Sequence, residues 1–133
     1  MEIIKIERTN TTPSVLFDFD NNQYEIKGCS RPEDVVAFYG QLIDWLTDIK
    51  QNINDELKAK TAKNPMIFKL CYDYFNSSSA KYILDIVLLI NKLFESGLQV
   101  AIEWQYKKED EDMLETGKEF TDLIKCPINF VAF

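Results

Sequence analysis

The sequence predicts an α/β fold: a two-layer sandwich with a mixed, mostly parallel sheet, helices mainly on one face and the order ββαβαβαβ. Three observations predict it. Segments of alternating hydrophobicity take turns with segments of helical periodicity, which is typical of crossovers between parallel strands. Two short alternating runs near the start indicate a hairpin and hence one antiparallel edge. Each of the first four predicted strands keeps a polar face, so one face of the sheet should be open.

The hairpin comprises residues 15–20 and 23–27, joined by Asn21 and Asn22, which tolerate the left-handed backbone angles of a tight turn. A helix should follow. Ser30 can cap its N-terminus while Glu33 reaches back, and Pro32 falls in the first turn, where no amide hydrogen is needed. The sequence therefore predicts a capping box at residues 30–33.

The apolar side chains of this helix recur at three- and four-residue spacings. They are Val35, Phe38, Tyr39, Leu42, Leu46 and Ile49. Ile53 and Leu57 continue the spacing among more polar neighbours, and Pro65 ends the segment. A strand is predicted at residues 66–75, because four large apolar side chains alternate there with polar ones.

Residues 79–95 are apolar around most of the helical circumference, which predicts the central buried helix, and Gly97 follows at the usual place of a left-handed C-terminal cap. Residues 98–106 form the clearest alternating strand. A polar, acidic helix over residues 110–123 comes next, and Ile128, Phe130 and Ala132 suggest a last strand.

The length of 133 residues and the absence of a linker composition indicate one domain spanning residues 1–133. Cys29, Cys71 and Cys126 are too far apart in sequence for a C-x-x-C pair, and we interpret them as free thiols of a reducing compartment. Neither a signal segment nor a membrane-spanning run is evident, so we expect a cytoplasmic protein. The net charge of −7 disfavours nucleic acid and anionic membranes as partners.

Catalytic motifs are missing from the sequence. It has no histidine, which removes the commonest general base and every Ser-His or Cys-His arrangement. Its four glycines are isolated, so there is no phosphate-binding loop. We therefore predict no enzymatic activity, no catalytic residue and no cofactor.

The acidic run at residues 109–112, Glu109, Asp110, Glu111 and Asp112, offers oxygen ligands for Mg²⁺ or Ca²⁺. No loop glycine or regular ligand spacing accompanies the run. Carboxylates are also favoured in a first helical turn by the helix dipole. We favour the structural interpretation and predict no metal site.

A polar cluster, Asn76 followed by Ser77, Ser78 and Ser79, separates a buried strand from the most hydrophobic helix. Asn and Ser are the preferred N-cap residues, so one of them is expected here in any case. Three serines exceed the need of one cap, however, and hydroxyls at such a turn would be exposed and accessible to a kinase. From the residues alone, both interpretations stay open.

Three patches of the sequence resemble the SiaC family of bacterial regulatory phosphoproteins, whose fold is like that of the STAS-domain anti-sigma-factor antagonists. Residues 28–34 (GCSRPED), with FY at 38–39 and DW at 44–45, resemble its G-x-S-x-P-E-N helix start and its F-Y and D-W positions. Residues 74–79 (YFNSSS) with Lys81 resemble its Y-F-N-T-S-S-x-K turn. Residues 104–106 (WQY) and 110–117 resemble its W-x-Y and D-E-D-M-x-E-x-G segments.

The resemblance implies a function. In the family, the hydroxyl after the asparagine accepts the phosphate, and that position is Ser77 here, beside Asn76, Ser78, Ser79 and Lys81. Family members work by partner switching: a serine/threonine kinase and a phosphatase set the phosphorylation state, and the unmodified form binds a downstream signalling protein such as a diguanylate cyclase. The resemblance thus predicts a phosphorylation-controlled binding module, with Ser78 and Ser79 as local caps.

The sequence departs from the family pattern at three places. Ser77 replaces the usual threonine, Asp34 replaces an asparagine, and residues 50–64 are longer and more polar than expected. Two alternative functions stay open beside the switch. One is a metal- or small-molecule-binding domain that uses residues 109–112, and the other is a structural subunit that assembles through the open sheet face.

Overall fold

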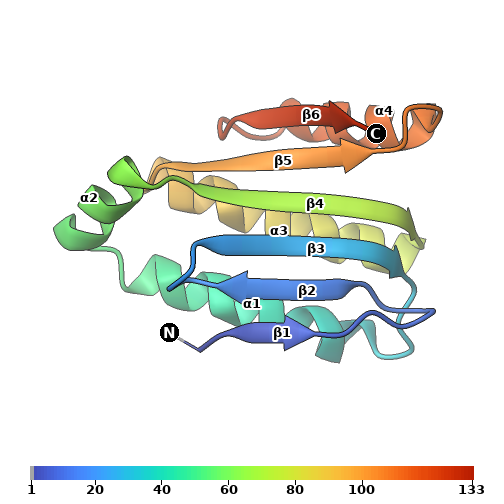
Figure 1. Ribbon diagram of the computed structural model, residues 1–133, viewed down its shortest axis with the longest axis horizontal. Coiled ribbons are helices and arrows are strands. Elements are labelled where there is room, and N and C mark those ends of the chain that lie inside the picture. The colour runs from blue at the N-terminus through green and yellow to red at the C-terminus, as the bar shows by residue number, and fades with distance from the viewer. Residues whose placement is uncertain (1) are drawn as a thin grey trace.

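The structure is a computed structural model that describes residues 2–133, which form six strands and four helices (Figure 1). The strands are β1 (Ile4–Ile6), β2 (Ser14–Asp18), β3 (Gln23–Ser30), β4 (Met66–Phe75), β5 (Val100–Tyr106) and β6 (Ile128–Ala132). The helices are α1 (Val35–Gln51), α2 (Asp55–Lys63), α3 (Ser77–Glu95) and α4 (Glu111–Thr121).

The six strands lie in one sheet in the order β1-β2-β3-β4-β5-β6, so each strand pairs with its neighbour along the chain. The pairs β1–β2 and β2–β3 are antiparallel, whereas β3–β4, β4–β5 and β5–β6 are parallel. The predicted hairpin turn is present, with Asn22 at a φ of 52°. The prediction of a mixed, mostly parallel sheet is confirmed.

The predicted order ββαβαβαβ is wrong because it lacks two elements, β1 and α2. Strand β1 has three residues, too few for a periodic pattern. Helix α2 lies within the expected continuation of the first helix. The chain leaves α1 at Gln51 and starts again after Asn54, whose side chain accepts a hydrogen bond from the Leu57 amide at 2.8 Å. A new cap, which favours a helix start, therefore divides the predicted segment.

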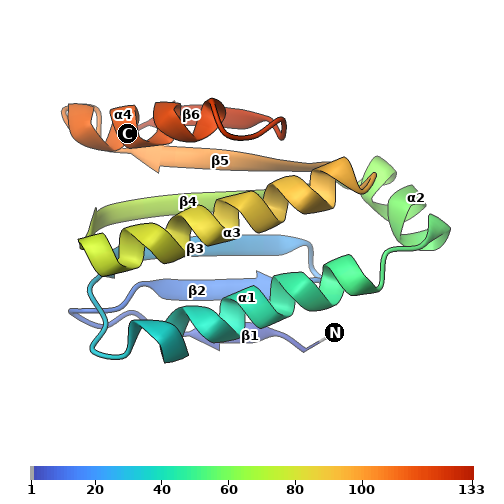
Figure 2. The same ribbon diagram turned by 180° about the vertical axis from the view of Figure 1, so that it is seen from behind.

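Helices α1 and α3 lie side by side against one face of the sheet, and α4 packs near β5 and β6 (Figure 2). The core fills the space between these layers. Its fully buried strand side chains include Phe17, Ile26, Phe68, Leu70, Ile102 and Trp104, and its helix side chains include Leu42, Leu46, Ile49, Ile86, Val87 and Ile90. Because helices cover only this face, the alternating strands carry apolar residues on one side and polar residues on the other.

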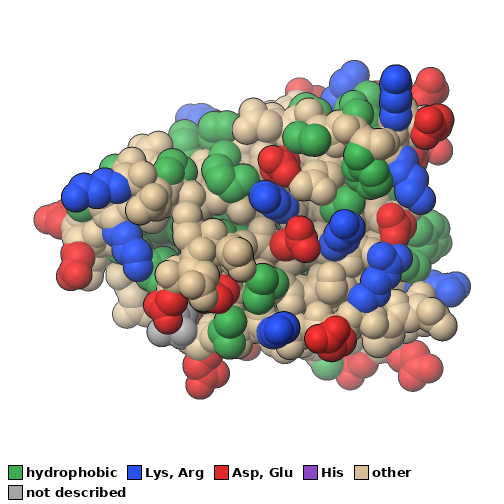
Figure 3. All heavy atoms as spheres, in the orientation of Figure 1, with side chains coloured by type: hydrophobic (Ala, Val, Ile, Leu, Met, Phe, Trp, Pro, Cys, Tyr) green, Lys and Arg blue, Asp and Glu red, His purple; other side chains and the backbone are tan. Residues whose placement is uncertain are grey.

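The opposite face of the sheet is open, and acidic and basic side chains are interspersed on it (Figures 1 and 3). Glu25 lies opposite Lys69 in the register of β3 and β4, and Lys69 lies opposite Glu103 in β4 and β5. Neighbouring strands thus place charges of alternating sign side by side. Among residues 2–133, no helix is long and apolar enough to cross a membrane.

Candidate phosphorylation site

The phosphosite turn, residues 76–79, joins β4 to α3 at the carboxyl end of the parallel strands. Asn76 is the N-cap of α3, because its side chain accepts a hydrogen bond from the Ser79 amide at 2.9 Å. Ser77 is the first helical residue. Ser77 and Ser78 are exposed, whereas Ser79 is fully buried. The expectation that Ser78 and Ser79 act as local caps is therefore wrong, since the asparagine before them has that role.

Ser79 belongs to a buried hydroxyl cluster beneath the turn, which also contains Ser30, Tyr39 and Tyr72. The Ser79 hydroxyl donates to the Ser30 carbonyl at 3.1 Å, and the Ser30 hydroxyl donates to the Ser79 oxygen at 2.9 Å. The Tyr39 and Ser30 hydroxyls are 2.5 Å apart, and those of Tyr72 and Tyr39 are 3.2 Å apart. The cluster joins β3, α1, β4 and α3.

The direction of these hydrogen bonds follows from donor counting, because each hydroxyl has one hydrogen. Ser30 gives its hydrogen to Ser79, so Tyr39 donates to Ser30. Tyr39 has then used its own hydrogen, so Tyr72 donates to Tyr39. The resulting chain runs from Tyr72 to the Ser30 carbonyl without an unpaired member. Such a fully satisfied network favours one packing arrangement of the elements that it joins.

Burial raises the pKa of both the Tyr39 and the Tyr72 phenols above their usual range near 10. For Tyr72, the neighbouring Tyr39 oxygen and the hydrogen bond to it raise the pKa further. Both phenols therefore stay protonated at neutral pH, as the donor chain requires. The cluster carries no charge and holds the phosphosite turn from below.

The predicted capping box at residues 30–33 is wrong. Ser30 is the last residue of β3, paired with Phe75, and its carbonyl also accepts the Asn76 amide at 3.0 Å. Helix α1 begins five residues later, and Asp34 caps it by accepting a hydrogen bond from the Ala37 amide at 3.0 Å. The residues of a capping box are present in the sequence, but Ser30 does not cap the helix, because its hydrogen-bond partners lie across the sheet.

Lys81 is exposed one helical turn after Ser77. Residues four apart in a helix lie on the same side, so a phosphate on Ser77 would be within reach of this ammonium group. The Lys81 nitrogen lies 5.4 Å from the centroid of the Tyr82 ring. An anion at this position would thus meet both the free amides of the first turn and one cation.

The acidic run is structural at its centre. Asp110 caps α4 by accepting a hydrogen bond from the Met113 amide at 3.0 Å. Within residues 2–133, no three or more His, Cys, Asp or Glu side chains are arranged so that they could hold a metal ion. Instead, Asp110, Asp112 and Met113 face Asp73 and Tyr74 across a surface hollow of about 330 Å³. The start of α4 therefore lies beside the end of β4, next to the phosphosite turn.

A sequence model described as SiaC family regulatory phosphoprotein matches residues 6–133. The chain belongs to the SiaC family. Its members are described as regulatory phosphoproteins, and the match covers all of the secondary structure that follows the first two residues of β1.

Relatives and solved structures agree with this assignment. An uncharacterized protein of Pseudomonas aeruginosa (strain UCBPP-PA14) is 28% identical over 132 residues, covering 99% of this chain and 98% of that one. SiaC of Pseudomonas aeruginosa superposes with a TM-score of 0.83 at 26% identity, covering 100% of both chains. The crystal structure of the diguanylate cyclase SiaD in complex with its activator SiaC matches with a TM-score of 0.83 at 26% identity, covering 98% of this chain and 99% of that chain.

The segments that carry the SiaC resemblance meet in space. Ser30 of the first segment and Ser79 of the second share the hydroxyl cluster. In the third, the Trp104 indole donates to the Met113 carbonyl at 2.9 Å, and a Cβ atom at Gly117 would lie 2.6 Å from the Trp104 ring. Glycine is therefore required where α4 crosses β5.

Sequence reasoning missed the contributions of Tyr39 and Tyr72 to this SiaC-family site. Tyr39 belongs to the apolar spacing of the first predicted helix and Tyr72 to the apolar face of the strand predicted at residues 66–75, and both are buried. A tyrosine at a buried position is the signal that the sequence offers, because a buried phenol needs a hydrogen-bond partner. The identity of that partner depends on residues 33 positions apart in the chain.

Proposed function

We propose that this chain is a phosphorylation-controlled protein-binding regulator in a bacterial partner-switching pathway. Ser77 is the phosphoacceptor. A serine/threonine kinase and a phosphatase set its state, and the unmodified form binds a downstream signalling protein, a diguanylate cyclase. The proposal extends to this chain the complex of SiaC with the diguanylate cyclase SiaD. It includes the STAS-like character of the fold, a single domain, a cytoplasmic location and the lack of catalytic activity.

One observation carries the site assignment: the Ser77 side chain is exposed at the first position of α3, on a turn held from below by buried hydrogen bonds. A kinase needs an accessible hydroxyl, and Ser77 offers it outside the core. Ser79 is buried and already hydrogen bonded, so it is a poor acceptor. Ser78 is the only other exposed hydroxyl in residues 76–79.

The switch acts through surface charge. A phosphate adds about −1.5 to −2 charges at neutral pH, and the free amides of a helix N-terminus accommodate an anion. The phosphorylated domain therefore stays folded while its contact surface changes. A partner that packs closely against Ser77 would then have to bury a dianion, which is costly unless that charge is paired.

The central experiment compares binding of a diguanylate cyclase from the same organism to the unmodified chain and to the chain stoichiometrically phosphorylated on Ser77. We expect at least a tenfold loss of affinity, about 1.4 kcal/mol. Ser77→Ala should abolish phosphate incorporation by the cognate kinase and retain cyclase binding, and Ser78→Ala is the matched control that keeps incorporation. Equal affinity with and without the phosphate would contradict the switch, and phosphate found only on Ser78 or Ser79 would contradict the site.

A further inference from the structure

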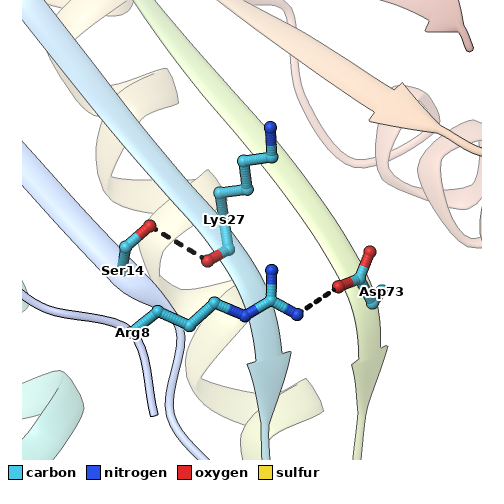
Figure 4. Close-up of polar contacts among 4 residues, drawn as sticks. All are labelled: Arg8, Ser14, Lys27 and Asp73. Carbon is cyan, nitrogen blue, oxygen red and sulfur yellow. Dashed lines mark hydrogen bonds and ion pairs between the residues drawn. The ribbon is translucent and has the colours of Figure 1, made fainter. Parts of the chain in front are cut away.

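Lys81 carries a positive charge that has no ionic partner in the described chain. Among residues 2–133, the one ion pair joins Arg8, between β1 and β2, to Asp73 of β4 at 2.7 Å, and the Arg8 side chain crosses β3 to form it (Figure 4). The Lys81 nitrogen lies 5.4 Å from the centroid of the Tyr82 ring, and a cation–ring contact at an exposed site is weak. The Lys81 ammonium group is therefore available to an anion.

The nearest carboxylate that α3 offers to Lys81 is Asp85, four residues further along the helix. The two side chains form no ion pair within the part of the chain that the structure describes. Ion pairs at this spacing are more favourable when the anion precedes the cation, in agreement with the helix dipole. Lys81 precedes Asp85, whereas Ser77 precedes Lys81 by four residues. A phosphate on Ser77 is thus the better placed partner for this ammonium group.

The first turn of α3 offers further donors to a phosphate. The Asn76 side chain accepts the Ser79 amide, and the helical hydrogen bonds begin with the Ala80 amide, which donates to the Asn76 carbonyl. The amides of Ser77 and Ser78 have no hydrogen-bond partner within residues 2–133. Free amides at a helix N-terminus favour an anion.

Other charged groups at this end of the sheet act in both directions. Asp110 and Asp112 of α4 line the hollow beside the end of β4, and they would repel a phosphate. Arg31, which follows Ser30 at the end of β3, would attract one. Arg31 belongs to a different element, whereas Lys81 is fixed by the same helix at the spacing that brings it to Ser77. Lys81 is therefore the cation that the helix itself assigns to the phosphate.

We propose that Lys81 binds the phosphate on Ser77 within the same chain and thereby protects it from removal. This inference rests on the proposed phosphorylation of Ser77. A phosphatase breaks the bond between phosphorus and the Ser77 Oγ atom and transfers the phosphoryl group to water, while the serine oxygen regains a proton. The phosphate must first leave Lys81 and the first-turn amides. Lys81 thus sets the lifetime of the modification.

The first test is thermal melting of the full chain with phosphoserine incorporated at residue 77 during translation, so that no cognate kinase is needed. We expect the phosphate to raise the Tm of the wild type by at least about 2 °C. This gain should largely disappear in Lys81→Met and persist in Lys81→Arg, which keeps the charge. Lys92→Met, in the last turn of the same helix, is the matched control and should keep the gain.

The second test measures dephosphorylation of the same proteins by a broad-specificity serine/threonine phosphatase. We expect Lys81→Met to lose its phosphate at least about threefold faster than the wild type, because a larger fraction of the phosphate is free to react. Lys81→Arg and Lys92→Met should lose it at the rate of the wild type.

Each contrary outcome overturns the proposal. An unchanged Tm on phosphorylation of the wild type would show that the phosphate is not bound by the chain. A gain that persists in Lys81→Met but disappears in Arg31→Met would assign the phosphate to Arg31, and equal dephosphorylation rates would exclude protection. These measurements do not involve the cyclase. Cyclase binding that ignores the phosphate would contradict the switch alone, and absence of a Tm gain would contradict the role of Lys81 alone.

Discussion

Buried phenols at the two ends of β3 differ in whether their hydroxyls form hydrogen bonds. At the carboxyl end, the hydroxyls of Tyr39 and Tyr72 enter a chain of hydrogen bonds that ends on the Ser30 carbonyl. At the amino end, the hydroxyl of Tyr24 is equally buried and has no partner within residues 2–133. The rings are alike and the burial is alike, so the difference lies in the neighbouring polar groups.

Buried polar groups in the core therefore have two different effects, depending on whether their hydrogen bonds are satisfied. A satisfied cluster stabilises one geometry of the turn that carries Ser77. An unsatisfied buried hydroxyl is unfavourable, because folding removes its hydrogen bonds to water and supplies no partner in their place. The carboxyl end is therefore a rigid platform, and the amino end retains a buried donor without an acceptor.

The largest loss of stability is expected when the centre of the hydroxyl cluster is removed. Ser30→Ala deletes the acceptor of Tyr39 and the donor to Ser79, which leaves a buried phenol unpaired. We expect the free energy of unfolding to fall by about 2–3 kcal/mol, measured by urea denaturation. Loss of about 1 kcal/mol or less would instead point to a simple helix cap and contradict the cluster.

Tyr39→Phe should cost about 2 kcal/mol, because it leaves the Tyr72 donor without an acceptor. In the double variant with Tyr72→Phe, that orphaned donor disappears. We therefore expect the double variant to lose less stability than the sum of the two single variants, with a coupling of about 0.5–1.5 kcal/mol. Additive losses in the denaturation series would mean that the two hydroxyls are not bonded.

Measurements of stability at alkaline pH compare the phenols at the two ends of β3 directly. The folded-state pKa values of Tyr24 and Tyr72 are raised above the unfolded value near 10, so their stabilising effect is complete below that pH and is lost as the pH rises. Each should lower the free energy of unfolding by about 1.4 kcal/mol per pH unit above pH about 10. Tyr24→Phe and Tyr72→Phe should therefore each flatten this decline in urea titrations at pH 9 to 11.5. A decline as steep as that of the wild type in either variant would contradict the shift for that residue.

The smallest effect is expected at the amino end of β3. Tyr24→Phe removes a hydroxyl that makes no hydrogen bond within the described chain, so the free energy of unfolding at pH 7 should change by at most about 0.5 kcal/mol. A stabilised variant would also agree with the structure, because an unsatisfied group is removed. A loss above about 1.5 kcal/mol would show that the hydroxyl has a partner in the folded protein.

Much of the fold could be predicted from local patterns. The strand at residues 66–75 and the central helix after it differ in hydrophobic period, so the turn between them and the position of Ser77 followed from the sequence. Helix α2 escaped prediction because Ile53 and Leu57 continue the spacing of α1, although the Asn54 cap separates the two helices. A three-residue strand such as β1 acquires its identity only by pairing with β2.

Some features of the site could likewise be predicted from the sequence, and others depended on the tertiary structure. The sequence by itself determined that a capping residue lies between β4 and α3 and that Ser77 stands at the helix start, because capping joins groups three residues apart, whereas the choice of Asn76 over the serines was decided by the structure. Only the tertiary structure decided that Ser30 bonds to Ser79, since these residues are 49 positions apart and meet through the parallel pairing of β3 with β4. It likewise decided that Tyr24 lacks a partner. Side-chain hydrogen bonds depend on directions and distances across elements, and hydrophobic periodicity specifies only which face of each element is buried.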